Sequence, residues 1–361
     1  MRTKNFLIGL LSLVAVSVVL IIFGQQKPKA IQNIVSTTHE QFRHFKVTLT
    51  ESGSKTLAVD EKYLKLLGLA EKNTPIYPQN VWHNTSLPVI VTYVTEDRES
   101  QAIGLINNVA RILPNNTILI YNIGLGNHGL RTLLNYCNSS HCQVITFALS
   151  DYPSHVQDVN LHAYRPIIIQ DALQHTGSVL FMEASKRFHR HVTAEALMEL
   201  RDTVTKGTAI IAWPMESKNA VSTLTHKKMF DYFHTDTDNF LFLPMVSADV
   251  LLVVNTGGVH ADIMLPWVQC ALTPDCIAPI GAQSAGCRFD KKPQYRYSGC
   301  HSYDTSALNI VLGIKFKLEY SRYTYQSEGV SFVSVPLEMA QHALMGLELN
   351  TTTEGETKRS Y

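Results

Sequence analysis

The sequence predicts an α/β fold, a three-layer sandwich built on a mostly parallel sheet and preceded by an N-terminal transmembrane helix. Two observations predict it. Short apolar runs alternate with helical stretches between residues 88 and 257, which is the pattern of strands joined by crossover helices. Ahead of them, Phe6–Phe23 is an uncharged apolar run of the length needed to cross a bilayer.

The apolar run at the start indicates a membrane anchor. As a helix, Phe6–Phe23 is roughly 27 Å long, close to the hydrocarbon thickness of a secretory-pathway membrane. The apolar region of a cleaved signal peptide is shorter, about 7–15 residues, and ends at a small-residue cleavage site. No such site is evident after Phe23. An uncleaved signal anchor is therefore the favoured interpretation, with residues 1–5 as a cytosolic tail.

Cysteines and sequons predict where the rest of the chain lies. All six cysteines and four N-x-S/T sequons follow the anchor, which suits an oxidising lumen and glycosylation. We therefore expect a single-pass type II protein of the Golgi or endoplasmic reticulum membrane. No C-x-x-C motif supports zinc binding. The cysteine spacings suggest, among several possible connectivities, Cys137–Cys142, Cys270–Cys276 and Cys287–Cys300. The sequons begin at Asn84, Asn115, Asn138 and Asn350.

Changes in composition divide the chain into regions. Residues 24–86 are polar and irregular, apart from a short helix predicted around Asp60–Lys72, and resemble a stem. Residues 87–335 form the predicted luminal domain, and 336–361 a C-terminal helix and polar tail. The predicted strands are Pro88–Thr95, Thr117–Gly124, Cys142–Leu149, Ser178–Ser185, Thr208–Met215 and Val250–Gly257. The predicted helices are Glu99–Ile112, Gly129–Cys137, Ala163–Leu173, Thr193–Thr205 and Leu224–Phe233.

The overall composition restricts the class of partner. Of 361 residues, 45% are hydrophobic and 17% are charged, which excludes intrinsic disorder. Thirty-one basic residues balance thirty acidic ones, and the formal net charge is +1. The chain as a whole therefore exerts no long-range attraction on a polyanion, and we do not expect nucleic-acid binding.

A glycine motif is one candidate site. Gly124, Gly126 and Gly129 match G-x-G-x-x-G between a predicted strand and helix, and Asp151 follows about where a ribose-binding acid would stand. The motif follows the second strand, however, whereas the dinucleotide fingerprint follows the first. A tight strand-to-helix turn is the favoured interpretation, and an S-adenosylmethionine-dependent methyltransferase is the alternative.

The carboxyl ends of the strands are a second candidate site, because ligands of open α/β sheets bind there. Glu183 ends a buried run, and Lys186 and Arg187 follow it closely. A carboxylate beside two cations could hold a divalent metal on a diphosphate, or the cations could neutralise the diphosphate directly. The other strand-end residues in this set are Thr92, Thr95, Tyr121, Asn122, Ser185, Asn255 and Gly257.

The order of these motifs resembles the GT-A class of nucleotide-sugar glycosyltransferases. In MEAS, Glu183–Ser185 stands where that class has a D-x-D-type motif. In VNTGG, Asn255–Gly258 matches its N-x-G turn, and CHSYDTSALN matches a later helix start. More closely, blocks such as IYNIGL, LHAYRPIIIQDAL and VLFMEASKRF are similar to those of a secretory-pathway family of unassigned function, often described as glycosyltransferases. The resemblance covers about Pro88–Phe316.

The resemblance implies a role for each candidate residue. Glu183 would face the sugar or a Mn²⁺ or Mg²⁺ ion, and Arg165 and Arg187 would contact the diphosphate, whose developing negative charge needs a cation. Asp304 would be the base that accepts the proton of the acceptor hydroxyl, although it also suits a helix N-cap. The residues implied at the nucleotide-sugar donor are Thr92, Thr95, Tyr121, Asn122, Ser185, Asn255 and Gly257.

Three hypotheses for the function follow. The first is a glycosyltransferase that moves a sugar from a nucleoside diphosphate donor to a glycan or glycoprotein acceptor. The second is an inactive transferase fold that acts as a luminal binding protein. It is motivated by departures from the family pattern, which has Asp at the positions of Asn122 and Glu183 and Gln at that of Thr305, and by Ser185 at the second metal-binding position. The third, methyl transfer, rests on the glycine motif.

Overall fold

A computed structural model describes residues 55–70, 87–290, 293 and 295–346. From Thr56 onward the described residues belong to one compact unit. The predicted anchor and cytosolic tail, most of the predicted stem, and the polar tail lie outside the described residues, as do the sequons at Asn84 and Asn350. No helix in the described part of the chain is long and apolar enough to cross a membrane.

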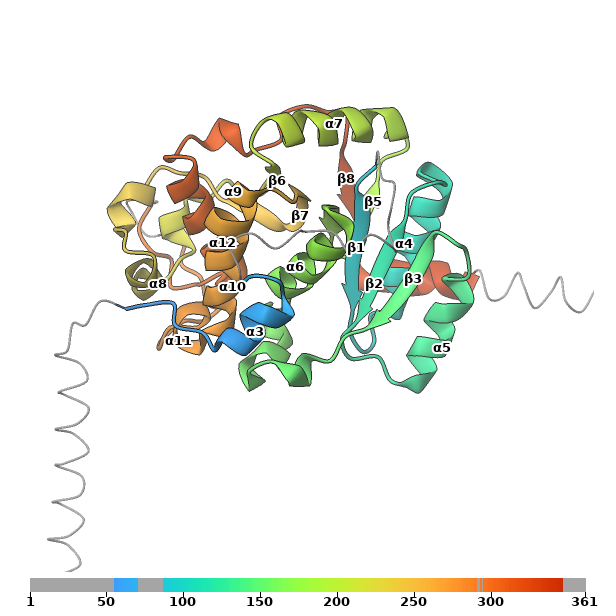
Figure 1. Ribbon diagram of the computed structural model, residues 1–361, viewed down its shortest axis with the longest axis horizontal. Helices are drawn as coiled ribbons and strands as arrows, with labels where there is room; N and C mark the ends of the chain where they lie inside the picture. Colours follow the sequence, from blue (N-terminus) through green and yellow to red (C-terminus); the bar gives the residue numbers. More distant parts are fainter. Residues whose placement is uncertain (1–54, 71–86, 291–292, 294, 347–361) are drawn as a thin grey trace, which may run out of the picture. The chain divides into compact units, whose positions relative to one another are not determined.

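A six-stranded sheet lies at the centre of the fold, with strand order β3-β2-β1-β4-β7-β6 (Figure 1). The strands β1 to β4 are parallel, β7 is antiparallel to β4, and β6 is antiparallel to β7. Within this sheet only β7 is therefore reversed, and the predicted mostly parallel α/β sheet is confirmed. The strands are β1 Val89–Val94, β2 Ile118–Asn122, β3 Cys142–Thr146, β4 Ser178–Met182, β6 Ile210–Pro214 and β7 Val246–Val254.

Burial on both faces explains why the central strands are apolar throughout. Every residue of β1, β2 and β4 is buried, as expected for parallel strands covered by helices on both sides. The reversed strand β7 differs along its length. Its first residues alternate between buried and half-exposed, whereas Val250–Val254 are all buried. The predicted strand began at Val250, so the structure adds Val246–Asp249 to it.

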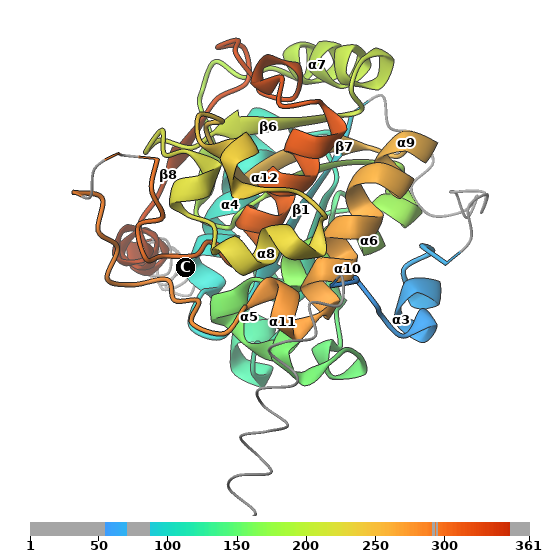
Figure 2. The ribbon, with the colours of Figure 1, turned by 90° about the vertical axis from the view of Figure 1, so that its left-hand side faces the viewer.

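Helices cover both faces of the sheet. In Figures 1 and 2, α4 and α5 lie on one face, and α6, α10 and α12 on the other. The five predicted helices are present, with their ends within three residues of the prediction at most positions. A separate two-stranded sheet pairs β5 (Lys186–Phe188) with β8 (Phe332–Ser334). The helices are α3 Glu61–Leu66, α4 Glu99–Ile112, α5 Asn127–Tyr136, α6 Tyr164–Thr176, α7 Ala194–Lys206, α8 Lys227–Tyr232, α9 Gly257–Val259, α10 Leu265–Leu272, α11 Pro274–Ile277 and α12 Tyr303–Lys315, and residues 337–346 are also helical.

The folded domain begins before the predicted residue 87. Leu67 and Leu69, just after α3, are buried in the core. The Gln170 side chain on α6 donates a hydrogen bond to the carbonyl of Leu67 at 2.9 Å. Residues 56–70 therefore belong to the domain and not to a stem, because their leucines complete its core.

All three disulfides suggested by the cysteine spacings are present, at Cys137–Cys142, Cys270–Cys276 and Cys287–Cys300. Each closes a short loop of the chain. The sequon asparagines Asn115 and Asn138 are both exposed.

Candidate functional site

A cavity opens where the strand order changes direction. The strands β2 and β3 lie on one side of β1, and α6 then carries the chain to β4 on the other side. Ligand sites of open α/β sheets form at such a switch point, beyond the carboxyl ends of the strands. Here the cavity has a volume of about 1080 Å³, and residues that follow β1 and β4, including Thr95 and Glu183, line it. We call it the switch-point cavity.

Arg165, in the first turn of α6, is the centre of a buried charge cluster in this cavity. Its Nη1 donates to Asp304 Oδ2 and its Nη2 to Glu183 Oε1, both at 2.7 Å. Asp249 Oδ1 lies 3.9 Å from the same Nη2. Only 4% of the Arg165 side chain is exposed. The guanidinium has therefore exchanged water for carboxylates, which offset the cost of burying its charge.

Burial shifts the proton affinity of the carboxylates. It raises the pKa of Glu183, against the opposing effects of Arg165 and of the Tyr93 hydroxyl, which donates to Glu183 at 3.0 Å. Burial also raises the pKa of Asp304 to about 7, although Arg165 opposes that rise. The Asp249 carboxylate is more accessible than either of these, because 40% of its side chain is exposed. Lys186 Nζ lies 3.7 Å from its Oδ2. Asp249 is thus the carboxylate of the cluster that an incoming molecule can reach.

Two histidines at the cavity are uncharged at neutral pH. Burial and the nearby Arg165 lower the pKa of His162 to about 4, and its Nδ1 accepts a hydrogen bond from Arg165 at 3.3 Å. Burial lowers the pKa of His301 to about 4. His301 Nδ1 accepts from the backbone of His226, and Nε2 donates to the carbonyl of Ile277, both at 3.1 Å. His301 therefore positions two loops and has no free nitrogen for acid–base work.

The start of α12 is strained beside the cluster. Tyr303 has a φ of 41°, in the left-handed region that costs an aromatic residue about 1–2 kcal/mol. The N-cap residue is Ser302, so Asp304 is not the cap and lies in the first turn. Trp267 holds this turn by donating to the carbonyl of Asp304 at 2.9 Å. Such strain, kept in place by its surroundings, is a feature of functional sites.

A second cavity of about 790 Å³ adjoins the first. Three residues, Asp249, Ser302 and Thr305, line both cavities. Aromatic rings form part of its wall: the Trp213 ring centroid lies 4.9 Å from that of Tyr325 and 5.2 Å from that of Phe332. We call it the aromatic cavity. The exposed carboxylate of Asp249 therefore stands where the two cavities meet.

The structure brings five of the predicted site residues together. They all line the switch-point cavity, where Arg165 joins the two predicted catalytic carboxylates. These five are Thr95, Arg165, Glu183, Ser185 and Asp304.

Three predicted strand residues do not line the switch-point cavity. Thr92 is fully buried within β1. The Tyr121 hydroxyl donates to Asp171 at 2.7 Å. Asn122 Oδ1 accepts hydrogen bonds from the backbone of Gly124 and Leu125, at 3.1 and 2.8 Å. None of the three lines the cavity, and Asn122 already occupies the amides of Gly124 and Leu125 at the start of the glycine motif.

Asn255, Gly257 and Arg187 lie away from the predicted position. Because β7 is antiparallel to β4, its carboxyl end lies at the opposite edge of the sheet, so placing Asn255 and Gly257 with the other strand ends was wrong. Asn255 instead donates to the carbonyl of Leu173 at 3.3 Å. Arg187 lines a different cavity, and its guanidinium donates to backbone carbonyls.

The residues at Glu183 do not fit a divalent metal ion. Glu183 Oε1 already accepts hydrogen bonds from Arg165 and Tyr93, and a guanidinium 2.7 Å away would repel a second cation. No group of three or more His, Cys, Asp or Glu residues within the described ranges is arranged to hold a metal. The metal expected at Glu183 is thus not supported by the side chains around it.

Sequence reasoning missed Asp249 and His162. Asp249 directly precedes the buried run of β7, and an acid at that boundary was visible in the sequence. Its relevance depends on the reversal of β7, which brings the beginning of this strand to the edge where the other strands end. His162 has a φ of 50° in the loop before α6, and the sequence carries no signal for that conformation.

Comparisons with known proteins agree with part of the expected resemblance. A family model described as a protein of unknown function (DUF1647) matches residues 54–170, which confirms the likeness to a family of unassigned function over that range. No curated protein matches the sequence.

Similar solved structures include three glycosyltransferases. The S. cerevisiae mannosyltransferase Ktr4p has 8% identity and a TM-score of 0.43, with 80% of this chain and 83% of that chain covered. The WbbM bifunctional glycosyltransferase has 11% identity and a TM-score of 0.41, with 68% and 40% covered, so this chain spans less than half of its length. Mouse xyloside xylosyltransferase 1 has 8% identity and a TM-score of 0.36, with 66% and 84% covered.

Proposed function

We propose that this domain is a glycosyltransferase, which moves a sugar from a nucleoside diphosphate donor to a glycan or glycoprotein acceptor in the lumen of the Golgi or endoplasmic reticulum. The observation that carries the proposal is the meeting of two cavities at Asp249. A transferase must bind two substrates side by side and place a base between them. The two cavities provide one compartment for each substrate.

The switch-point cavity suits the donor. It lies at the carboxyl ends of β1 and β4, where nucleotides bind in open α/β sheets. Arg98 and Arg165 line it, and guanidinium groups bind phosphate oxygens with two parallel hydrogen bonds. In this proposal Arg98, which is exposed, contacts the diphosphate, and Arg165 fixes the position of Glu183 beside the sugar.

The aromatic cavity suits the acceptor. The rings of Trp213, Tyr325 and Phe332 offer flat apolar surfaces, and Glu216 and Ser217 add polar groups on the same wall. A sugar ring has both an apolar face and hydroxyl groups, so it can pack on the rings while it bonds to the polar side chains. The predicted acceptor, a glycan or glycoprotein, has this chemistry.

Asp249 would then act as the base. The acceptor hydroxyl oxygen forms a bond to the anomeric carbon, the bond from that carbon to the diphosphate oxygen breaks, and the acceptor proton passes to the Asp249 carboxylate. The electron pair of the broken bond leaves with the diphosphate, whose added charge the arginines offset. Asp304 is the less suitable base, because only 1% of its side chain is exposed.

Thermal stabilisation by ligands tests the donor proposal. Uridine or guanosine diphosphate should raise the melting temperature, since a ligand at 100 times its Kd stabilises by about 2.7 kcal/mol. The shift should persist when a chelator replaces Mn²⁺. Stabilisation by S-adenosylhomocysteine alone would support the methyltransferase instead. If neither the nucleoside diphosphates nor S-adenosylhomocysteine raises the melting temperature, donor binding is contradicted.

Sugar transfer tests the role of Asp249. A screen of nucleotide sugars against glycan acceptors should find an activity that Asp249→Asn lowers by about 100-fold or more, in the range of general-base catalysis. Glu199→Gln is the matched control, since Glu199 is an exposed acid of α7 that lines neither cavity. Donor binding without transfer to any acceptor would favour the second candidate, an inactive binding protein. The observation behind that candidate is that Arg165 already engages both Glu183 and Asp304.

A further inference from the structure

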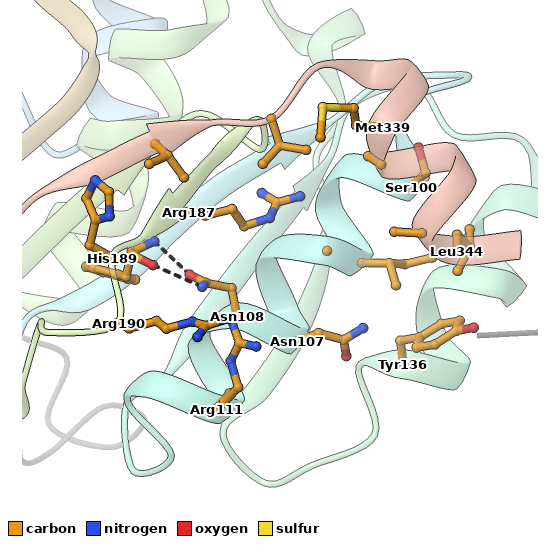
Figure 3. Close-up of a pocket in the computed structure, with 17 residues that line it drawn as sticks. Ser100, Asn107, Asn108, Arg111, Tyr136, Arg187, His189, Arg190, Met339 and Leu344 are labelled. Atoms are coloured by element: carbon orange, nitrogen blue, oxygen red, sulfur yellow. Dashed lines mark hydrogen bonds between the residues drawn. The ribbon is translucent and has the colours of Figure 1, made fainter. Parts of the chain in front are cut away.

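A third cavity, of about 730 Å³, lies apart from the two described above. It is bounded by α4, by β5 and the residues after it, and by the helical residues 337–346 (Figure 3). It shares no lining residue with the switch-point cavity or the aromatic cavity. The proposed transfer reaction makes no use of it.

The charges that line this third cavity all have one sign. Arg111, Arg187 and Arg190 line it, together with His189, and no aspartate or glutamate does. In the part of the chain that the structure describes, none of the three arginines is in an ion pair with a carboxylate. Three guanidinium groups around one cavity repel one another unless an anion joins them.

Arg187 is the buried member of the three. Its Nη1 donates to the carbonyls of Ala184 and Lys186, at 2.6 and 2.7 Å, and its Nη2 donates to the carbonyl of Gln101 at 2.8 Å. Backbone dipoles therefore hold this cation in place without neutralising it, and burial lowers its pKa to about 10. Gly104 on α4 makes room for the guanidinium, because a Cβ there would overlap it.

Most of the other side chains that line the cavity are apolar, and Ser100, Asn107, Asn108 and Tyr136 are the uncharged polar ones. In Figure 3, Arg190 and Arg111 lie at one end of the cavity, Met339 and Leu344 lie at the other, and Arg187 lies between them. The apolar side chains that line the cavity are Ile103, Phe188, Val333, Val335, Met339, Ala340, Ala343 and Leu344. The cavity thus has a cationic end and an apolar end.

We propose that this third cavity binds an anionic amphiphile, a molecule with a carboxylate or phosphate head and a hydrocarbon body. The head would bond to the arginines at the cationic end, where charge-assisted hydrogen bonds are strong. The hydrocarbon would cover the apolar side chains, at about 25 cal/mol for each Å² removed from water. The volume lies within the range of small-molecule sites.

Calorimetric titration of the full chain with soluble probes tests the proposal. Octyl phosphate and octanoate carry both parts, inorganic phosphate carries the head alone, and octanol carries the tail alone. We expect octyl phosphate or octanoate to bind at least about 10-fold more tightly than either single-part probe. The double variant Arg111→Gln/Arg190→Gln should weaken that binding about 10-fold or more, since a hydrogen bond to a charged group contributes about 1.5 kcal/mol or more. Both arginines are exposed, so the fold should tolerate the change.

A matched control removes two positive charges elsewhere. Arg131→Gln/Lys206→Gln changes exposed residues of α5 and α7 that do not line this cavity, and it should leave the affinity unchanged. Both double variants keep the apolar N-terminal run unchanged, so any binding of the probes to that run contributes equally to the two titrations.

Three results would overturn the proposal. One is equal binding of octanol and octyl phosphate, which would show that the arginines play no part. Another is an equal loss of affinity in the control variant. The third is binding that is seen only after truncation at Gly346, which would assign the cavity to the chain's own C-terminal segment.

Discussion

Replacing Arg165 with methionine should destabilise the protein in a pH-dependent way. The change removes a cation that donates to Glu183 and Asp304 at 2.7 Å each and leaves their carboxylates buried without a counter-charge. Breaking a buried ion pair from one side typically costs about 3–5 kcal/mol. We expect a loss of that size in the free energy of unfolding at pH 8.

The pH dependence follows from the protons that the two carboxylates take up. The variant can keep both neutral, at a cost of about 1.4 kcal/mol for each pH unit above their unfolded pKa values, which are 4.5 for Glu183 and 3.8 for Asp304. At pH 5 this cost is the same in both proteins for Asp304, because the wild-type Asp304, with a pKa of about 7, is also neutral there. Only Glu183 then contributes to the deficit, by about 1 kcal/mol or less. At pH 8 the wild-type Asp304 is ionised beside Arg165, whereas the variant has no cation for either carboxylate. The deficit should therefore grow from about 1 kcal/mol at pH 5 to about 3–5 kcal/mol at pH 8.

Urea denaturation at the two pH values measures both deficits. Arg131→Met, an exposed arginine of α5, is the control and should change stability by less than about 0.5 kcal/mol. The triple variant Arg165→Met/Glu183→Gln/Asp304→Asn should recover most of the loss, because it removes the uncompensated charge. A deficit that is equal at pH 5 and pH 8, or no recovery in the triple variant, would refute the reasoning.

Three further predictions concern stability. Gly104→Ala should destabilise by about 1–2 kcal/mol despite its better helix propensity, because its Cβ would displace the guanidinium of Arg187 from its carbonyl partners. Gly257→Ala, with no atom within 4 Å of its Cβ and with Thr256 as the N-cap, should be nearly neutral in the same thermal melts. Replacing Cys287 and Cys300 with serine should lower the free energy of unfolding by about 3 kcal/mol, and replacing Cys137 and Cys142 should lower it by about 2 kcal/mol. The first pair closes a loop of 13 residues and the second a loop of 5, and a larger loss for the shorter loop would contradict this chain-entropy argument. For Asp304, the folded pKa of about 7 exceeds the unfolded 3.8, so the stability of the wild type relative to Asp304→Asn should fall by up to about 4 kcal/mol from pH 4 to pH 8. A relative stability that stays constant over this range would show that Asp304 is charged throughout.

The sequence predicts the sheet and helices well because their apolar periodicity is local. The run from Ile118 to Tyr121 is apolar because both faces of β2 are covered. This run by itself predicts a buried strand, without information from any other segment. Disulfides were predictable for the same reason, since each joins cysteines close in sequence. The early start of the domain was missed because Leu67 and Leu69 become core residues only through contacts with a distant helix.

The candidate site was predictable only in part, because strand direction is not a local property. Glu183 follows the parallel strand β4 and Arg165 lies at the start of α6, the helix that leads into that strand, so the two are brought together as expected. Asn255 was expected at the cavity and Asp249, which was not predicted, lies there instead, since the antiparallel pairing of β7 reverses which of its ends faces the cavity. Arg187 stands four residues after Glu183, yet a turn and the short strand β5 direct it into another cavity. The hydrophobic pattern of the sequence does not predict that turn, so the position of Arg187 could not be predicted from it.

The two halves of β7 have different consequences for how the protein can evolve. Leu251–Val254 are buried on both faces, so nearly every substitution there lowers the yield of folded protein. Ser247 and Asp249 alternate with buried neighbours and line the aromatic cavity. The side chain of Ser247 can change while the backbone pairing that holds the sheet together stays the same, and Asp249 is constrained only by what the cavity does. One strand thus separates positions that answer to the cavity from positions on which survival of the fold depends.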